Sequence, residues 1–445
     1  MKKLLKSFTQ TQLISVSFLL VILVGTFLLM LPVSSRAGEW TSFLDSLFTS
    51  TSATCVTGLI VFDTYTHWSL FGQCVILLLI QIGGLGGMTL ITLFVMVLRK
   101  RISLQSRKLM MQSAGIMDNA NVLIILKQIA IGTAVFEGIG FVLLATQFIP
   151  EFGWKFGIFA SLFHAISAFC NAGFDLFGRI SPCSSLTYFS NNVVVNLTII
   201  GLIVIGGIGF LVWNDIYFNK GHLKKYQLHT KVVLTATAIL IGVGWILFFI
   251  TERNNAFAGR SLPSQILCAL FQSVTTRTAG FNTVDYANLS ESGQLLTMIL
   301  MLIGGSPGST AGGVKTTTFM LLIVMAVAAA KNKPTTIFHY SIDRDTMRQA
   351  TSIATIYLFL VMAGAMALCM WEPFPMSDIL FEATSAIGTV GLTMGITGSL
   401  SAYSKILIAL LMYIGRIGGL SFALSLSEQR RQAPMRRPYG KISIG

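Results

Sequence analysis

Four short stretches of the chain share a pattern that could bind a cation without charged ligands. Each is amphipathic and ends in a glycine followed by an apolar residue, and together they occupy 46–59, 161–174, 269–281 and 379–392. Aligned on that glycine, a phenylalanine lies ten residues upstream in the first, second and fourth copies and nine upstream in the third. Glycine permits left-handed backbone, and rings of backbone carbonyl oxygens can replace the hydration shell of a monovalent cation. The chemistry predicted is coordination of such a cation.

The predicted selectivity filter consists of each glycine and the two residues before it. These residues are Val56, Thr57 and Gly58; Asn171, Ala172 and Gly173; Thr278, Ala279 and Gly280; and Thr389, Val390 and Gly391. Short pore helices near 42–53, 157–168, 265–275 and 376–386 would direct their negative C-terminal ends at the ion. The alternative is that the glycines form tight turns in the external loops of a transporter with other machinery. Four copies at equivalent positions favour the filter.

A second glycine-rich segment interrupts the longest apolar run of the chain, residues 290–330. Its proline removes a backbone donor and its glycines favour non-helical backbone, so the helix should open into an intramembrane loop. Such a loop would block a passage beneath the filter, although a flexible kink without gating is the alternative. This segment, called the gate loop below for the role that a family resemblance gives it, comprises Gly304, Gly305, Ser306, Pro307, Gly308, Ser309, Thr310, Ala311, Gly312 and Gly313.

Several charged residues lie within apolar stretches and need partners. Arg416 is predicted to bind carbonyls of the gate loop, either to hold it shut or as a purely structural clamp, and Lys315 to add positive charge below it. Arg277 precedes the third filter glycine and is predicted to pair with Glu382 behind the filter. Glu137 is an intramembrane acid whose partner the sequence does not name. Lys405 lies near the end of a span, where its side chain is expected to reach the interface.

Enzymatic chemistry finds little support in the sequence. The six cysteines show no metal-binding spacing, and the apolar stretches contain no HExxH motif, paired aspartates or Ser/Lys dyad. No covalently bound cofactor is expected. The formal charge of +14 would suggest a nucleic-acid partner in a soluble protein, but 53% of the 445 residues are apolar and only 11% are charged. Because soluble chains carry roughly 25% charged residues, a membrane protein without a nucleic-acid partner is predicted.

The elements that would position these residues are eight apolar stretches long enough to approach a membrane crossing. They are predicted near 12–32, 73–98, 122–149, 193–218, 231–250, 290–330 with its break, 350–371 and 404–426. Lys and Arg number 21 on the side of the N-terminus and five on the other side. The positive-inside rule therefore places both termini in the cytoplasm, while ten of the acids face outward.

The fold class predicted is an all-α integral membrane protein. Its eight transmembrane helices form four span/pore-helix/span repeats around a central pore, a potassium-channel-like pseudo-fourfold arrangement. The repeats are 12–98 with Gly58, 122–218 with Gly173, 231–330 with Gly280 and the gate loop, and 350–426 with Gly391, followed by a cytoplasmic tail at 427–445.

The filter stretches TCVTG, FCNAG, RTAGF and GTVGL, the interrupted sixth span and IGRIGG in the last span resemble the Trk/Ktr/HKT superfamily of potassium transporters. The resemblance covers essentially the whole chain and is strongest to the membrane subunits of Ktr systems. It implies a K⁺ uptake subunit in a bacterial plasma membrane, with K⁺ held by filter carbonyls and with the loop at 304–313 as an intramembrane gate. Gly58, where sodium-selective plant relatives carry serine, favours potassium. A sodium-coupled or sodium-conducting transporter of the same fold is the alternative.

The resemblance also implies partners. Ktr membrane subunits pair as homodimers on a cytosolic octamer of nucleotide-binding KtrA-type subunits. The longest cytoplasmic pieces, 99–121 and 427–445, are too short for a nucleotide-binding domain. Nucleotide is therefore expected only on the partner subunit. The basic loops could contact that ring or face anionic membrane lipid, and the sequence does not decide between the two.

Overall fold

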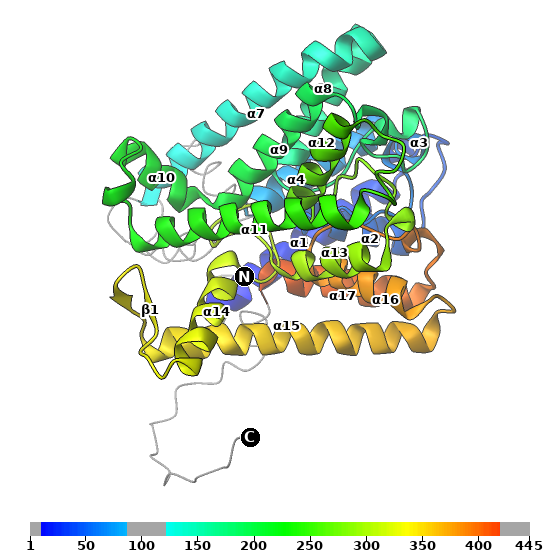
Figure 1. Ribbon diagram of the computed structural model, residues 1–445. Coiled ribbons are helices and arrows are strands. Elements are labelled where there is room, and N and C mark those ends of the chain that lie inside the picture. The colour runs from blue at the N-terminus through cyan, green and yellow to red at the C-terminus, as the bar shows by residue number, and fades with distance from the viewer. Residues whose placement is uncertain (1–9, 87–121, 419–445) are drawn as a thin grey trace.

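The computed structural model describes residues 10–86 and 122–418. This part of the chain is almost entirely helical (Figure 1). Up to residue 219 its elements are α1 (Gln10–Met30), η2 (Pro32–Ser34), α2 (Phe43–Thr54), α3 (Thr64–His67), α4 (Leu70–Leu85), α7 (Val122–Phe152), α8 (Trp154–Phe169), η3 (Phe177–Arg179), η4 (Thr187–Phe189), α9 (Val193–Ile208) and α10 (Phe210–Asn219).

The second half continues the same pattern. Its elements are η5 (Leu223–Lys225), α11 (Leu228–Glu252), α12 (Leu262–Thr275), η6 (Tyr286–Asn288), α13 (Glu291–Leu302), α14 (Thr316–Ala330), β1 (Thr336–Ile337), β2 (Tyr340–Ser341), α15 (Arg344–Trp371), α16 (Met376–Gly388), η7 (Thr397–Ser399) and α17 (Ala402–Ile417). The two strands form an antiparallel hairpin that pairs Thr336 with Ser341.

Four short helices correspond to the predicted pore helices. α2, α8, α12 and α16 each lie within about one turn of the predicted range and end just before the predicted filter residues. Their starts are set by local signals: the Ser42 hydroxyl accepts the Asp45 N–H at 3.1 Å before α2, and a proline occupies the first turn of α12.

The packing of these short helices is cyclic. Each lies against a helix of the preceding predicted repeat: α8 against α4, α12 against α9, α16 against α13, and α2 against α17. The last contact joins the beginning of the chain to its end. The four short helices therefore form the inner layer, with α7, α11 and α15 outside them (Figure 1).

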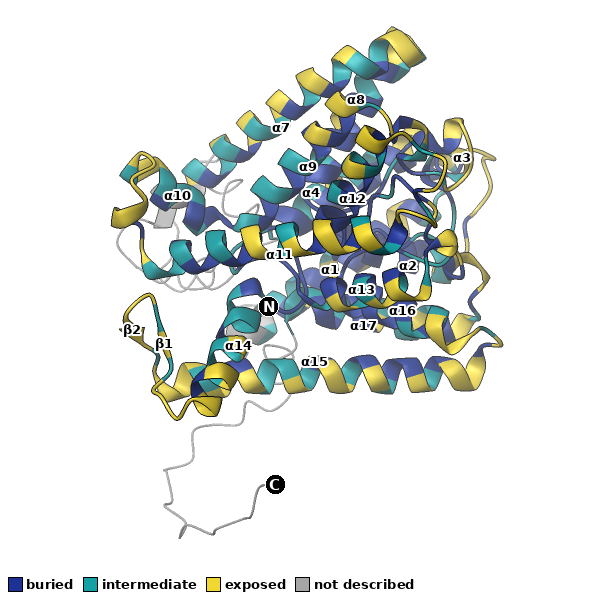
Figure 2. Ribbon diagram, viewed as in Figure 1, coloured by how far each residue is buried: buried dark blue, intermediate teal, exposed yellow. Residues whose placement is uncertain are grey.

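The exterior of the described part differs from that of a water-soluble protein, although the interior is largely apolar as well. Large apolar side chains are exposed on the outer helices, such as Val142 on α7 (59% exposed) and Phe359 on α15 (71% exposed). Hydroxyl side chains are buried along the inner helix α2. Figure 2 shows the dark interior around the short helices and exposed residues along α7, α11 and α15. Apolar exteriors of this extent indicate contact with lipid.

Three helices in the described ranges are long and apolar enough to cross a membrane alone: Lys127–Phe152, Leu228–Glu252 and Arg344–Trp371. α9 and α10 pass the same test only as a pair, bent by 93° at the break between them. The apolar stretch predicted over 193–218 therefore consists of two helices and not of one continuous helix, because Gly209 between them has a φ of 95° that a continuous helix cannot contain.

Candidate functional site: four glycine turns and the loop beneath them

Each short helix is followed by a turn of the same backbone conformation. We call residues 56–58, 171–173, 278–280 and 389–391 the four glycine turns. Their first residues have positive φ although none is glycine: Val56 (56°), Asn171 (59°), Thr278 (67°) and Thr389 (51°). Their glycines, Gly58, Gly173, Gly280 and Gly391, have φ of 95°, 70°, 79° and 91°. Left-handed backbone at a residue with a side chain is uncommon, so its recurrence at four equivalent positions indicates a conformation imposed by the surrounding contacts.

Hydrogen bonds to the preceding helix impose this conformation. The middle residue of each turn donates its N–H to a carbonyl near the helix end: Thr57 to Ser52 (2.8 Å), Ala172 to Ser167 (2.8 Å), Ala279 to Thr275 (3.0 Å) and Val390 to Ser385 (2.9 Å). In the first and fourth turns the glycine N–H also donates to a serine hydroxyl, at 3.1 Å in both. These N–H groups are directed back at the short helix.

The four turns meet at one place. A Cβ on Gly58 would lie 2.5 Å from the Ala172 carbonyl oxygen, on Gly173 2.8 Å from that of Ala279, on Gly280 2.5 Å from that of Val390, and on Gly391 against that of Thr57. Each glycine thus faces the carbonyl of the next turn, and the fourth faces the first. Carbonyl oxygens converge here without an acidic side chain, which is a set of ligands suited to a partly dehydrated monovalent cation.

A loop of 303–315 separates α13 from α14 and lies against the fourth glycine turn. Its two ends are joined, because the Gly304 N–H donates to the Val314 carbonyl (2.8 Å) and the Thr316 N–H to the Gly305 carbonyl (3.0 Å). A Cβ on Gly312 would collide with the Thr389 hydroxyl. The break predicted at 304–313 is therefore present as a closed loop directly beside the glycine turns.

Two positively charged side chains donate hydrogen bonds to backbone carbonyls of this loop and not to acidic side chains. Arg416 donates from Nη1 to the Thr310 carbonyl and from Nη2 to the carbonyls of Gly83 and Gly84, the latter at 3.3 Å. Lys315 Nζ donates to the Ala311 carbonyl at 2.7 Å. The contact expected between Arg416 and the loop is thus present. That it holds a gate shut stays a prediction.

The predicted ion pair between Arg277 and Glu382 is wrong. Arg277 extends to α11, where its Nη2 lies 3.5 Å from the Thr237 hydroxyl. Glu382 accepts hydrogen bonds from the hydroxyls of Thr393 (2.8 Å) and Thr397. The two side chains do not meet because each is bound by hydroxyls of its own predicted repeat, 231–330 for Arg277 and 350–426 for Glu382.

Glu382 belongs to a set of residues whose role the sequence did not reveal. The residue directly after the aligned phenylalanine is polar in every copy, and in three copies it holds the segment that follows the glycine turn. The contacts are Leu176 N–H to His164 Nε2 (3.3 Å), Gln272 Nε2 to the Thr283 hydroxyl (3.1 Å) and Thr393 to Glu382. The signal in the sequence was the polar residue that follows the aligned phenylalanine in all four copies.

The intramembrane acid Glu137 also has a partner, since Gln81 Nε2 donates to its carboxylate at 3.1 Å.

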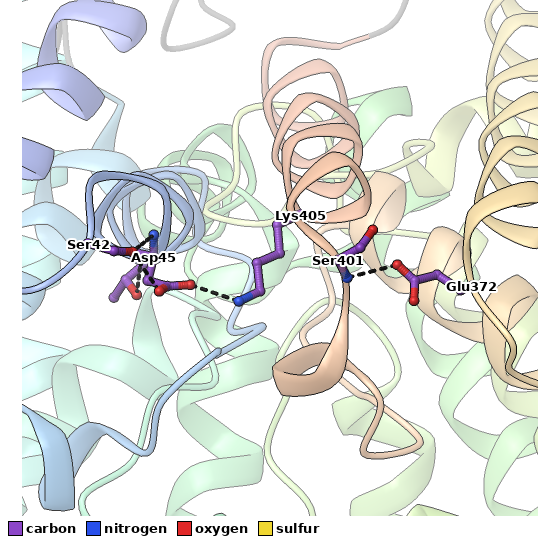
Figure 3. Close-up of polar contacts among 6 residues, drawn as sticks. Ser42, Asp45, Glu372, Ser401 and Lys405 are labelled. Atoms are coloured by element: carbon purple, nitrogen blue, oxygen red, sulfur yellow. Dashed lines mark hydrogen bonds and ion pairs between the residues drawn. The ribbon is translucent and has the colours of Figure 1, made fainter.

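Lys405 joins the last quarter of the chain to the first. Its Nζ lies 2.8 Å from the carboxylate of Asp45, with side-chain exposures of 13% and 17% (Figure 3). Nearby, the Ser401 N–H donates to Glu372 at 2.8 Å. The sequence suggested only that Lys405 reaches the membrane interface. In the structure it also fixes α17 to α2 through Asp45.

Charge reversal tests this connection. Asp45→Lys or Lys405→Asp alone places like charges together, and each should lower the melting temperature in detergent by roughly 2–4 °C, since a partly exposed pair contributes about 1 kcal/mol. The double reversal should recover most of that loss in a thermal unfolding assay. If the double variant melts at or below the melting temperature of each single variant, the pair contributes nothing to stability.

Comparison with known proteins identifies the family of the chain. The model of the TrkH family, described as a cation transport protein, matches residues 2–434. The chain belongs to the TrkH cation transport family. Transport, and not catalysis, is the activity of this family.

Relatives within the family are similar over nearly their full length. The chain is 42% identical to the potassium/sodium uptake protein NtpJ of Enterococcus hirae, over 100% of this chain and 99% of that one. It is 40% identical to Ktr system potassium uptake protein B of Bacillus subtilis, over 98% and 97%. Its fold matches the crystal structure of the potassium transporter TrkH from Vibrio parahaemolyticus with a TM-score of 0.70 at 19% identity, covering 92% and 84% of the two chains. The chain is thus a membrane transporter subunit of the Ktr/Trk type.

Proposed function

We propose that the four glycine turns form the selectivity filter of a potassium-uptake pore. The observation that carries this proposal is the closed cycle in which each turn glycine faces the carbonyl oxygen of the next turn. Each turn follows a helix C-terminus, whose partial negative charge favours a cation at the same place. Relatives named for potassium uptake support the choice of ion.

The proposed architecture is four span/pore-helix/span repeats around that filter, with eight crossings and both termini in the cytoplasm. The cyclic packing of α2, α8, α12 and α16 supports four equivalent units. α10 and the β1–β2 hairpin, which adjoin basic loops, lie at one end of the molecule, whereas α3 lies at the other (Figure 1). This separation supports the assignment of the basic loops to the cytoplasmic side.

The loop between α13 and α14 is the proposed gate. It lies directly beside the fourth glycine turn and is bound by Arg416 and Lys315, so movement of the loop would open the passage below the filter. The proposed regulator is a cytosolic octamer of nucleotide-binding KtrA-type subunits carrying a homodimer of this chain. The names of the Ktr-system relatives support a multi-subunit system.

Sodium transport is the second candidate, because the relative from Enterococcus hirae is named for both potassium and sodium uptake. Uptake of ⁸⁶Rb⁺ into potassium-loaded liposomes containing the protein separates the two. A potassium filter predicts uptake that unlabelled K⁺ inhibits at far lower concentration than Na⁺. Equal inhibition by both ions would overturn potassium selectivity.

Sodium coupling requires a separate measurement. Growth of potassium-uptake-deficient cells that express the chain should be rescued at low external K⁺. Rescue that is lost when Na⁺ is withdrawn would indicate that Na⁺ is required, whereas rescue independent of Na⁺ is the result expected for a simple potassium pore.

A further inference from the structure

The bend between α9 and α10 lies directly against the proposed gate loop. A helix leaves its last carbonyls and its first N–H groups without partners inside the helix. A 93° bend therefore creates both kinds of unpaired group at one point: carbonyls at the end of α9 and N–H groups at the start of α10. In a membrane these groups must find protein partners.

The loop between α13 and α14 supplies those partners. The Ser306 N–H donates to the Gly207 carbonyl at 2.9 Å, and the Thr310 N–H to the Gly206 carbonyl at 3.3 Å. In the opposite direction the Phe210 N–H, the first of α10, donates to the Gly308 carbonyl at 2.8 Å. The loop between α13 and α14 thus supplies hydrogen-bond partners for the unpaired backbone groups at the bend between α9 and α10.

The fit at the bend leaves no room for a larger residue. Gly209 has a φ of 95°, and a Cβ there would lie 2.7 Å from the Pro307 carbonyl oxygen. By contrast, a Cβ on Gly201, earlier in α9, would meet nothing within 4 Å. The loop therefore contacts α9 at its broken end, whereas the space beside Gly201 is open.

Thr310 is held from three sides at once. Its N–H bonds to Gly206, its hydroxyl donates to the Phe169 carbonyl at 3.2 Å, and its carbonyl accepts from Arg416. The bend and Arg416 thus hold the same residue of the loop from different helices. The far end of α10 is itself fixed, because Asp215 accepts hydrogen bonds from Asn219 (2.7 Å) and from the Gln227 N–H (3.0 Å).

We propose that the bend between α9 and α10 is a second holding site for the gate loop, with Gly209 and Phe210 as positioning residues that keep the loop closed. The inference rests on the proposed role of this loop as the gate. The closed loop is then held by two independent sets of contacts, and opening must break both the backbone hydrogen bonds at the bend and those of Arg416.

The test compares ⁸⁶Rb⁺ flux through the purified chain in liposomes, without any partner subunit. Gly209→Ala should raise this flux about tenfold or more, because the added methyl group displaces Pro307. Gly201→Ala, the same change eight residues earlier at an open position within α9, should leave the flux unchanged. Size-exclusion chromatography before reconstitution restricts the comparison to folded protein.

A second pair of variants isolates one hydrogen bond and remains informative if Gly209→Ala fails to fold. Phe210→Pro removes the N–H that binds Gly308, at the first position of a helix, where proline is tolerated. Phe210→Ala removes the same ring but keeps the N–H. Flux should therefore be several-fold higher for the proline variant than for the alanine variant.

Arg416→Ala distinguishes failure of this inference from failure of the proposed gate. If Arg416→Ala raises the flux while Gly209→Ala matches Gly201→Ala and Phe210→Pro matches Phe210→Ala, the second holding site is refuted and the gate stands. If Arg416→Ala, Gly209→Ala and Phe210→Pro all leave the flux unchanged, the loop is not a gate and the inference fails with it.

Discussion

Replacing Arg416 with alanine is expected to raise the basal potassium leak of the isolated chain at least tenfold. The change removes the donors to the Thr310, Gly83 and Gly84 carbonyls and frees the loop from α4. A hydrogen bond to a charged group contributes about 1.5–3 kcal/mol, and 1.4 kcal/mol corresponds to a tenfold change in an equilibrium. The loss of one such bond from the closed state is therefore sufficient. ⁸⁶Rb⁺ efflux from liposomes measures the leak.

Lys405→Ala is the matched control for this experiment. It removes a cation from the same helix, α17, but its partner is Asp45, which lies on α2 and not in the loop. This variant should lose some thermal stability without leaking. Equal efflux from the Arg416→Ala and wild-type proteins would leave Arg416 as a structural clamp only.

Gly58→Ser is expected to abolish the discrimination of K⁺ from Na⁺ and to slow Rb⁺ uptake at least tenfold. The serine Cβ would lie 2.5 Å from the Ala172 carbonyl oxygen. The backbone at this position would also hold a residue with a side chain at a φ of 95°. Both effects displace the carbonyls that face the ion. Uptake into liposomes, with increasing external K⁺ or Na⁺ as competitor, measures rate and selectivity together.

Gly395→Ser separates the two causes. Gly395 has a φ of 92°, nearly that of Gly58, but a Cβ there would meet nothing within 4 Å. The control therefore carries the same backbone strain outside the carbonyl cycle and should retain selectivity. If Gly58→Ser transports K⁺ and Na⁺ with the same preference as Gly395→Ser, the filter assignment fails.

Local patterns predicted the short helices and the turns well. The glycine-terminated repeats located α2, α8, α12 and α16 and the glycine turn that follows each of them, because apolar periodicity and glycine act over a few residues. The interruption of the sixth apolar stretch was visible for the same reason. The bend at Gly209 was not predicted, because glycines within an apolar stretch do not by themselves require a break in a helix.

Pairings between distant residues required the folded chain. The sequence contained the cations Lys405, Arg277 and Arg416, but nothing in their spacing indicated that Lys405 binds Asp45 or that Arg277 turns to Thr237 instead of Glu382. Hydrogen-bond partners depend on the direction of each side chain after the helices pack, and that direction varies with a rotation of a few tens of degrees about a helix axis.

The sequence by itself therefore determined the class of protein, the positions of the four glycine turns and the existence of a loop in the sixth apolar stretch, since these depend on composition and on repeats within single segments. Only the tertiary structure decided that the turn glycines face one another's carbonyls and that Thr310 is held by both α9 and Arg416. The physical reason is that unpaired backbone groups in a membrane must be satisfied by whichever segment packs beside them, and this neighbour is set by the whole fold.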